Sequence, residues 1–188
     1  MAALLLRSDR RLFFALWPDE ATRAALSHQT RKAVRRCGGR PVPPANYHLT
    51  LAFIGNQPAE LFKEIVAAAT RVRAAPFELT LEQYGHWPKP RVLWLGPAPA
   101  ASDGAANTLS PPAVIAAQLW DGLEALGLRR ELRPFRAHVT LARKVAALPE
   151  VPSPEPLIWK ASSFVLVESV TAQSGAVYSV AWEFLLTG

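Results

Sequence analysis

The sequence predicts an α+β fold with mainly antiparallel strands, and two observations support this prediction. Alternating and apolar segments give about seven or eight strands and three helices, in the order β-α-β-α-β-β-α-β-β-β, so several strands follow one another directly and can pair as hairpins. A short pattern also occurs twice, at residues 48–52 and 138–142, each time as His, apolar, Thr, Leu, Ala. We expect the two copies to build one site from two related halves of a single domain spanning residues 1–188.

A buried strand and a helix are expected at the start of the chain. Residues 12–17 are apolar and end at Pro18, which predicts a central strand buried on both faces. A proline followed by two acids is typical of a helix start. We expect the helix to run to about Arg35, with basic residues at its C-terminal end, and to stop at Gly38-Gly39.

The first copy of the pattern predicts a strand that is followed by turn residues. The segments expected in order are a strand around 47–54, a turn at 55–58, a helix over about 59–73, strands at 77–82 and 91–96, and a loop at 85–90 between these two strands. This loop contains His86 and Trp87, which are suited to contact a ligand, although a packed Trp-Pro pair explains them equally well.

The second copy follows a segment of unusual composition. Residues 97–112 are mostly Ala, Pro, Ser and Gly, which predicts a mobile surface loop or linker. The remaining segments are expected to be a helix over about 113–126, a strand at 137–143, a proline-rich connection at 149–156 and two final strands near 161–170 and 177–186.

Composition favours a compact domain with an anionic partner. Half of the 188 residues are apolar and 19% are charged, which argues against disorder. The formal net charge of +6 and a pI near 10 favour nucleic acid as a partner, although an Arg-rich coding bias would give the same balance. The single cysteine, Cys37, excludes an internal disulfide and any multi-cysteine metal site.

The location of the protein is predicted from the absence of targeting signals. The apolar opening at residues 1–6 is too short for the apolar region of a signal peptide, and no apolar run approaches the length of a membrane span. We therefore expect a soluble, cytoplasmic protein that has no membrane partner. We also expect it to be a monomer.

The spacing within each pattern predicts which side chains share a face. A strand alternates its side chains, so His48, Thr50 and Ala52 should point one way and their apolar neighbours the other way. The same alternation groups His138 with Thr140 and Ala142. Each strand would then present an imidazole and a hydroxyl opposite a face anchored in the core.

Two imidazoles that face one substrate suit acid–base chemistry at neutral pH. With an ordinary pKa of about 6.5, one neutral ring can accept a proton from water while the other, protonated, donates to a leaving oxygen. The hydroxyls of Thr50 and Thr140 and the guanidinium of Arg143 can bind phosphate oxygens, and no metal or other cofactor is required. A single histidine in an apolar strand is more often a packed residue, but the duplication favours catalysis. A two-histidine metal site is disfavoured because neither pattern contains Asp or Glu.

The residues around both patterns resemble the two-histidine (2H) phosphoesterase superfamily, whose signature is two His-x-Thr/Ser-x motifs. More narrowly, the sequence resembles the bacterial and archaeal RNA 2′,3′-cyclic phosphodiesterases, historically named 2′-5′ RNA ligases. The resemblance covers nearly the whole chain, and the matching segments are 11–16, 46–55, 85–87, 91–96, 133–143 and 164–169, followed by Gly175 and Tyr178.

This resemblance implies a bilobal α+β fold, in which two pseudo-symmetric lobes of antiparallel sheet are flanked by helices and the active-site cleft lies between them. It implies His48 and His138 as the catalytic pair, Thr50 and Thr140 on the phosphate, and Arg143 as a further phosphate contact. The first histidine of the family is usually assigned as the general acid and the second as the base. The loop at 97–112 is longer than the resemblance leads us to expect.

The implied reaction is metal-independent opening of a ribose 2′,3′-cyclic phosphate to a 2′-phosphomonoester. The partners would be RNA ends that carry such a phosphate, or small 2′,3′-cyclic nucleotides. Two alternatives remain open: ATP-independent 2′-5′ ligation as the main role, and a non-catalytic module that only binds RNA ends.

Overall fold

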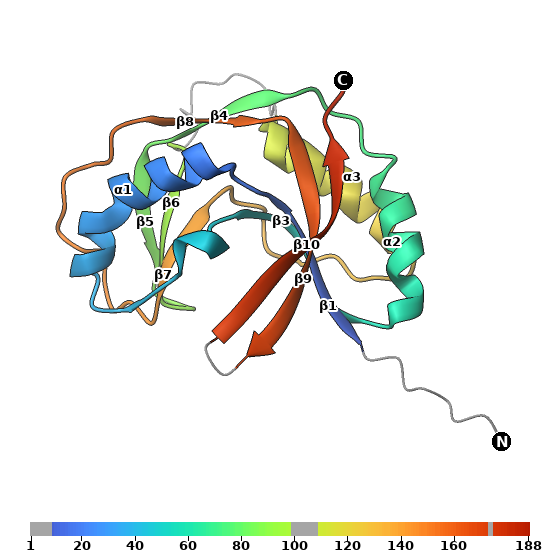
Figure 1. Ribbon diagram of the computed structural model, residues 1–188, viewed down its shortest axis with the longest axis horizontal. Coiled ribbons are helices and arrows are strands. Elements are labelled where there is room, and N and C mark those ends of the chain that lie inside the picture. The colour runs from blue at the N-terminus through green and yellow to red at the C-terminus, as the bar shows by residue number, and fades with distance from the viewer. Residues whose placement is uncertain (1–8, 99–108, 173–174) are drawn as a thin grey trace.

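The computed structural model describes residues 9–98, 109–172 and 175–188. Within these residues the strands form one eight-stranded sheet and one two-stranded sheet, and all neighbouring strands run antiparallel (Figure 1). The large sheet has the order β10-β9-β1-β3-β7-β6-β5, with β2 beside β7, and the small sheet pairs β4 with β8. The strands are β1 (Arg10–Leu16), β2 (Arg40–Pro41), β3 (Leu49–Gln57), β4 (Phe77–Leu81), β5 (Gln83–Trp87), β6 (Val92–Gly96), β7 (Val139–Arg143), β8 (Leu157–Ala161), β9 (Ser163–Ala172) and β10 (Gly175–Leu185).

In the part of the chain that the structure describes, three α-helices cover the large sheet on one side. They are α1 (Glu20–Arg36), α2 (Phe62–Ala69) and α3 (Pro111–Glu124), and short 3-10 segments lie at η1 (Pro44–Asn46) and η2 (Ala59–Leu61). Figure 1 shows α1 beside the half that contains β5, β6 and β7, and α2 and α3 beside the half that contains β1 and β3. The start of α1 is fixed by Asp19, whose carboxylate accepts a hydrogen bond of 2.7 Å from the backbone N–H of Thr22.

The two halves of the large sheet meet at a single pair of residues. The strands β9, β1 and β3 form one half with the edge strand β10, and β5, β6 and β7 form the other. Between β3 and β7 the only register partners in the described chain are Leu49 and Val139. The predicted bilobal α+β fold with two lobes of antiparallel sheet is confirmed, and the two copies of the duplicated pattern lie at the seam between the lobes.

The main core lies between the large sheet and the helices. It contains Phe14 of β1, Leu26 of α1, Ile65 of α2 and Leu119 of α3, each at most 1% exposed. Fully burying a side chain of this size contributes roughly 1.5–3 kcal/mol to stability. A second, smaller cluster lies on the other face of the sheet, and its buried members are Phe13, Ala15, Val165 and Val167. The prediction that the first strand is buried on both faces is therefore confirmed.

Several predicted boundaries were wrong. The turn expected at 55–58 is largely strand, because β3 continues to Gln57 and pairs there with Arg10 of β1. The helix expected over 59–73 ends at Ala69, where a turn begins and the hydroxyl of Thr70 bonds to the carbonyl of Ala67 at 2.8 Å.

Three strands were not recognised in the sequence. Much of the loop expected at 85–90 belongs to β5, which pairs with β6. The strands β2 and β8 were missed because β2 has only two residues and β8 directly precedes β9. Most of the loop expected at 97–112 lies outside the described residues.

Candidate active site

His48 and His138 stand at the seam, directly before β3 and β7. Leu49 and Val139 pair with each other and are fully buried against the helices. Side chains alternate along extended chain, so His48 and His138 lie on the opposite face of the sheet from the helices. The strands run antiparallel through the Leu49–Val139 pair. His48 therefore lies at the level of Thr140 along the seam, and Thr50 lies at the level of His138.

A β-bulge interrupts each copy of the pattern at the same place. Phe14 and Ala15 pair with Ala52 and Thr50, so Leu51 is an extra residue on β3. On β7 the equivalent extra residue is Leu141. The expected alternation was therefore wrong beyond each threonine, since a bulge shifts all later side chains by one position.

The bulges change which residues reach the candidate site. Ala52 and Ala142 were expected beside the histidines, but both are buried in the main core, where Ala52 pairs with Phe14 and Ala142 with Leu93. The next residues, Phe53 and Arg143, consequently return to the face that carries the imidazoles.

The ring of His48 is held by hydrogen bonds at both nitrogens. Its Nδ1 lies 2.7 Å from the backbone oxygen of Asn46, and because a carbonyl only accepts, Nδ1 carries the proton of the neutral ring. Its Nε2 lies 3.1 Å from Oγ1 of Thr50, whose hydroxyl then donates to it. In the neutral form, Nε2 is therefore the nitrogen that can accept a proton.

Three aromatic rings surround His48. Trp17 stacks on the imidazole, with centroids 5.7 Å apart and an interplanar angle of 14°. Phe13 lies at 4.9 Å and Tyr178 makes an edge contact at 5.4 Å. Asn46 joins this arrangement to β10, since its side-chain amide donates to the backbone oxygen of Ala176 at 3.0 Å.

His138 has the same backbone anchor and fewer aromatic neighbours. Its Nδ1 donates to the backbone oxygen of Arg136 at 2.7 Å, which again leaves Nε2 as the acceptor of the neutral ring. Trp87 makes an edge contact with the imidazole at 4.5 Å and packs in turn on Trp94 at 5.4 Å. Gly85 makes room for Trp94, because a Cβ atom at Gly85 would lie 1.9 Å from the indole.

Both imidazoles have lowered pKa values. Burial lowers the pKa of His48 to about 4, with smaller contributions from the positive charges of His138 and Arg143. Burial also lowers the pKa of His138, and the charge of Arg143 acts in the same direction. The structure thus brings Arg143 close enough to influence both rings.

His86, which the sequence offered as a ligand contact, and three arginines have mainly structural contacts. His86 bonds through Nε2 to the backbone oxygen of Val145 at 3.0 Å, and the guanidinium of Arg11 lies 5.2 Å from the ring centre of Phe53. Arg133 pairs with Glu131, and Arg91 donates to the backbone oxygen of Lys144 at 3.3 Å.

Trp17 and Tyr178 contact His48, and neither was identified as a site residue from the sequence. For Trp17 a signal was present, because it follows Phe13 and Ala15 at a spacing of two in the first strand. The contact of Tyr178 depends on the pairing of β9 with β1 and β10, which lie more than a hundred residues from β1 in the sequence.

Comparison with known proteins identifies the family of the chain. Residues 16–94 match the family described as LigT like Phosphoesterase. An RNA 2′,3′-cyclic phosphodiesterase of Thermus thermophilus is 35% identical over 187 residues, which covers 95% of this chain and 91% of that protein. The chain belongs to the LigT-like phosphoesterase family. A protein of the same name from Escherichia coli is 35% identical over 77% of this chain and 78% of its own length.

Solved structures, among them one of LigT, have the same fold. Escherichia coli LigT complexed with 3′-AMP superposes with a TM-score of 0.81 at 31% identity, covering 96% of this chain and 99% of that chain. A Thermus thermophilus protein, TT0787, gives a TM-score of 0.75 at 34% identity over 94% and 97% of the two chains. The predicted resemblance to RNA 2′,3′-cyclic phosphodiesterases is thus confirmed at the level of the family, whose curated members are named as enzymes.

Two further observations concern metal sites and membrane-spanning helices. In residues 9–98, 109–172 and 175–188, no three His, Cys, Asp or Glu side chains gather in an arrangement that could hold a metal ion. No helix in the same part of the chain is long and apolar enough to cross a membrane.

Proposed function

We propose that this LigT-like phosphoesterase is a metal-independent RNA 2′,3′-cyclic phosphodiesterase. His48 and His138 act as an acid–base pair that opens a terminal ribose cyclic phosphate to a 2′-phosphomonoester. The observation that carries this proposal is the matched tethering of the two rings. Each donates Nδ1–H to a backbone carbonyl two residues earlier, so both present Nε2 on the same face of the sheet.

The reaction needs one proton acceptor and one proton donor. A neutral imidazole takes a proton from water as the water oxygen forms a bond to phosphorus. The second imidazole, protonated, donates to the ribose 3′-oxygen as the P–O3′ bond breaks. The ribose then carries a 2′-phosphate and a free 3′-hydroxyl, and the two histidines have exchanged protonation states.

The phosphate is bound by the neighbouring side chains. The hydroxyls of Thr50 and Thr140 flank the seam from opposite strands and donate to non-bridging oxygens. The guanidinium of Arg143 adds a charge-assisted hydrogen bond to the same group. Because Thr50 already bonds to Nε2 of His48 in the free protein, substrate binding requires its hydroxyl to turn toward the phosphate.

The pKa of His48 constrains which histidine acts as the acid and which as the base. With a pKa of about 4, His48 is neutral at pH 7 in the free protein and is suited to be the base. The family resemblance assigns the acid role to the first histidine. For His48 to act as the acid, the negative charge of the bound phosphate must raise its pKa toward 7. The ends of a bell-shaped pH–rate profile report the two pKa values that govern the pair.

Hydrolysis of 2′,3′-cyclic AMP in the presence of EDTA tests the proposal. We expect turnover without added metal, and phosphorus NMR of the product should show a 2′-phosphate. Formation of a 3′-phosphate would reverse the assignment of the leaving oxygen. The absence of turnover, with a cyclic-ended oligonucleotide also unreacted, would favour the non-catalytic RNA-end-binding module.

Ligation is the second candidate activity. The chemistry is the same ring opening, in which the 5′-hydroxyl of a second RNA replaces water as the nucleophile, gives up its proton to the base, and the P–O3′ bond breaks as the 3′-oxygen is protonated. A cyclic-ended RNA incubated with a 5′-hydroxyl RNA without ATP would give a longer product joined by a 2′-5′ linkage. A cytoplasmic location and a monomeric state remain predictions.

A further inference from the structure

A strongly basic surface lies along the C-terminal part of α1. Arg31, Lys32, Arg35 and Arg36 are all exposed and line a hollow of about 340 Å³. Within the described chain, none of the four forms an ion pair with an acidic side chain. Of the four, Arg36 alone makes a side-chain hydrogen bond to a residue that the structure describes, and it donates to the backbone oxygen of Glu150 at 3.2 Å.

Helix stability does not explain the positions of these four charges. Arg31 and Arg35, and likewise Lys32 and Arg36, are four residues apart, a spacing at which like charges destabilise a helix by about 0.2–0.5 kcal/mol per pair. The helix dipole favours cations only in the last turn, which accounts for Arg35 and Arg36 and not for the other two.

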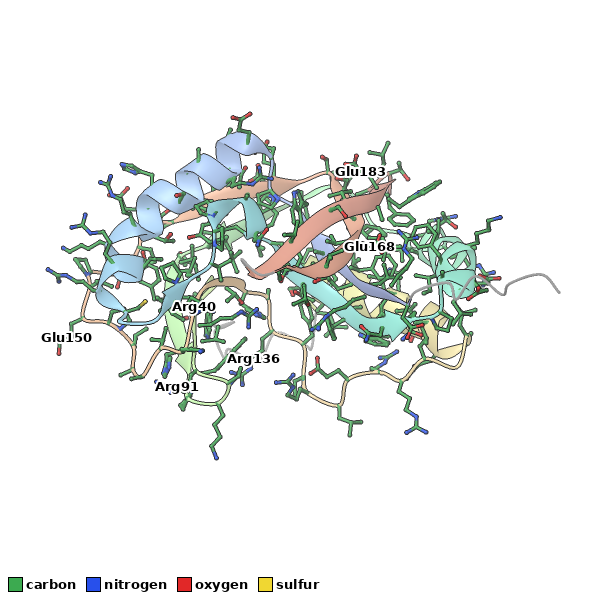
Figure 2. All side chains as sticks on the ribbon, turned by 60° about the horizontal axis from the view of Figure 1, so that its bottom comes forward. Arg40, Arg91, Arg136, Glu150, Glu168 and Glu183 are labelled. Atoms are coloured by element: carbon green, nitrogen blue, oxygen red, sulfur yellow. The ribbon has the colours of Figure 1, made fainter. Side chains whose placement is uncertain are left out.

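The basic surface is joined to the candidate active site through β2. Arg40 is the register partner of Arg143, whose charge acts on both histidines. Gly39 lets the two strands approach closely, since a Cβ atom there would lie 2.6 Å from the backbone oxygen of Arg143. Arg40 is exposed, and in the view of Figure 2 it is labelled on the same part of the molecule as Arg91 and Arg136.

The distance from the site to α1 suits a short length of nucleic acid. Register partners lie about 5 Å apart, the four residues from Arg36 to Arg40 span at most ~14 Å, and Arg31 to Arg36 covers about 7.5 Å of helix. The path from Arg143 to Arg31 is thus at most about 27 Å long. Several nucleotides of a single strand can cover this distance.

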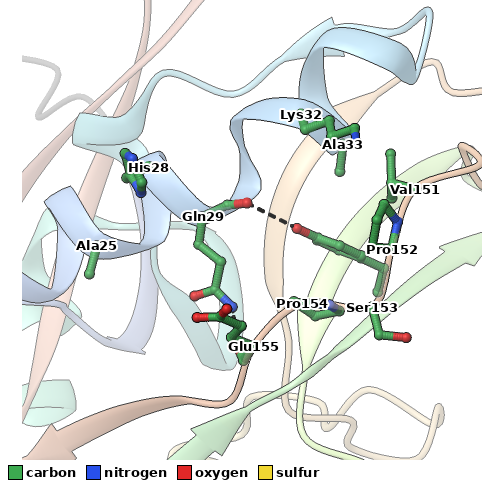
Figure 3. A pocket seen from close by; sticks show the side chains of 11 residues that line it. Ala25, His28, Gln29, Lys32, Ala33, Val151, Pro152, Ser153, Pro154 and Glu155 are labelled. Carbon is green, nitrogen blue, oxygen red and sulfur yellow. Dashed lines mark hydrogen bonds between the residues drawn. The ribbon is translucent and has the colours of Figure 1, made fainter.

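A second hollow extends the same surface. It has a volume of about 460 Å³, lies between α1 and residues 151–155, and includes Lys32 (Figure 3). Its walls are held together by Tyr84, whose hydroxyl donates to the backbone oxygen of Gln29 at 3.3 Å, and by Gln29, whose amide donates to the backbone oxygen of Glu155.

From these observations we infer that Arg40 and the basic residues of α1 bind the phosphate backbone of the RNA that precedes the reacting end. This inference rests on the proposed function, because it assumes that the cyclic phosphate occupies the site at the seam. It makes cyclic-ended RNA, rather than a free cyclic nucleotide, the preferred substrate. The contacts are electrostatic, so the preference depends on chain length and salt and not on base sequence.

The test compares two substrates and two matched triple variants. The substrates are 2′,3′-cyclic AMP and a 5′-hydroxyl RNA of about ten nucleotides with a 2′,3′-cyclic phosphate end. The Arg31→Ala/Lys32→Ala/Arg35→Ala variant removes three charges from α1 and retains Arg36. The control, Lys63→Ala/Arg71→Ala/Arg129→Ala, removes three exposed charges from the other lobe. Circular dichroism confirms that each variant is folded.

The expected result is a selective loss on RNA. The α1 variant should keep its kcat/KM for 2′,3′-cyclic AMP, and lose roughly tenfold or more in kcat/KM for RNA at low salt. The slope of log kcat/KM for RNA against log salt should fall in magnitude by about 2, since each phosphate contact with single strands contributes about 0.7. The control should retain most of its activity on RNA, and Arg31→Lys/Arg35→Lys, which keeps the charges, should behave like the wild type.

Three results would overturn the inference. They are no loss on RNA, an equal loss in the control, and an equal loss on both substrates, which would mean that α1 acts through the fold. If the wild type hydrolyses neither substrate, the proposed function fails. Fluorescence anisotropy with a 3′-phosphorylated RNA and the same variants then tests the basic surface alone.

Discussion

The half of the site around His48 and the half around His138 share a backbone plan. Each histidine donates Nδ1–H to the carbonyl two residues before it, and each pattern contains a bulge directly after its threonine. The residue five positions after each histidine returns to the site face. In the first half this residue is Phe53 and in the second it is Arg143. The same backbone arrangement therefore presents an aromatic ring in one half and a positive charge in the other.

The two halves differ in what packs on the imidazole. Among the described residues, three rings contact His48 and one contacts His138. Thr50 is bonded to its histidine, whereas Thr140 makes no hydrogen bond to His138 in the described chain. A repeated backbone therefore fixes the direction of both Nε2 atoms, while the packing around each ring sets how readily it takes up a proton.

The largest expected effect tests whether both halves take part in the chemistry. His48→Ala and His138→Ala should each lower kcat/KM for 2′,3′-cyclic AMP by at least ~10²-fold, because each removes a general acid–base group. His28→Ala, at an exposed position of α1, serves as the control and should have little effect. A large loss in only one of the two variants would reduce the other half to a binding role.

Acid stability distinguishes the more enclosed half. The pKa of His48 is about 4 in the folded chain and about 6.5 when unfolded, so the unfolded state binds more protons between these values. The free energy of unfolding is therefore unaffected by this group above pH 6.5. It should fall by about 3 kcal/mol as the pH drops from 6.5 to 4.

Urea unfolding of His48→Asn at pH 7 and at pH 4.5 checks this prediction. The variant should lose much less stability on acidification than the wild type. His138→Asn should change the pH dependence in the same direction, because burial lowers the pKa of His138 as well. The same pH dependence in wild type and His48→Asn would contradict the assignment.

Removal of a single aromatic ring should shift the pKa of the histidine that it contacts and leave the pKa of the other histidine unchanged. Trp17→Leu takes away the ring stacked on His48, so the pKa of His48 should rise by on the order of one pH unit. Trp87→Leu should act in the same way on His138. NMR titration of the imidazole protons measures both shifts, with Trp182→Leu on the exposed part of β10 as the control. Equal shifts of both rings in either variant would mean that the halves are not independent.

The smallest expected effect concerns the two threonines. Thr50→Ala and Thr140→Ala should each lower kcat/KM by about tenfold, the value of one hydrogen bond to a charged group, and Thr→Ser should restore it. In the free protein, only Thr50→Ala should change the nitrogen NMR shift of its histidine, since only Thr50 is bonded to Nε2. A change at His138 in Thr140→Ala would remove this difference between the halves.

Much of the candidate site could be predicted from the sequence. A duplicated His-x-Thr in two similar apolar frames is local information, and it indicates the paired strands, the two rings and their hydroxyls. The class of fold also follows from local patterns, because adjacent apolar segments with turns between them favour antiparallel pairing.

The bulges at Leu51 and Leu141 were decided only by the tertiary structure. An extra residue is defined by what lies opposite it, and the partners Phe14 and Leu93 are remote in sequence. Regular alternation predicts that Ala52 and Ala142 face the site and that Arg143 faces the core. In the paired strands the bulges turn the two alanines into the core and Arg143 toward the site.

The sequence by itself therefore indicated the kind of chemistry that we propose, since each copy of the pattern contains the residue types and their local spacing. The tertiary structure alone decided the environment of each ring. Trp17, Tyr178 and Trp87 reach the histidines through pairings of β1, β9, β10 and β6 that no local pattern specifies. Burial by these rings lowers the pKa values, and burial depends on the whole assembly of strands.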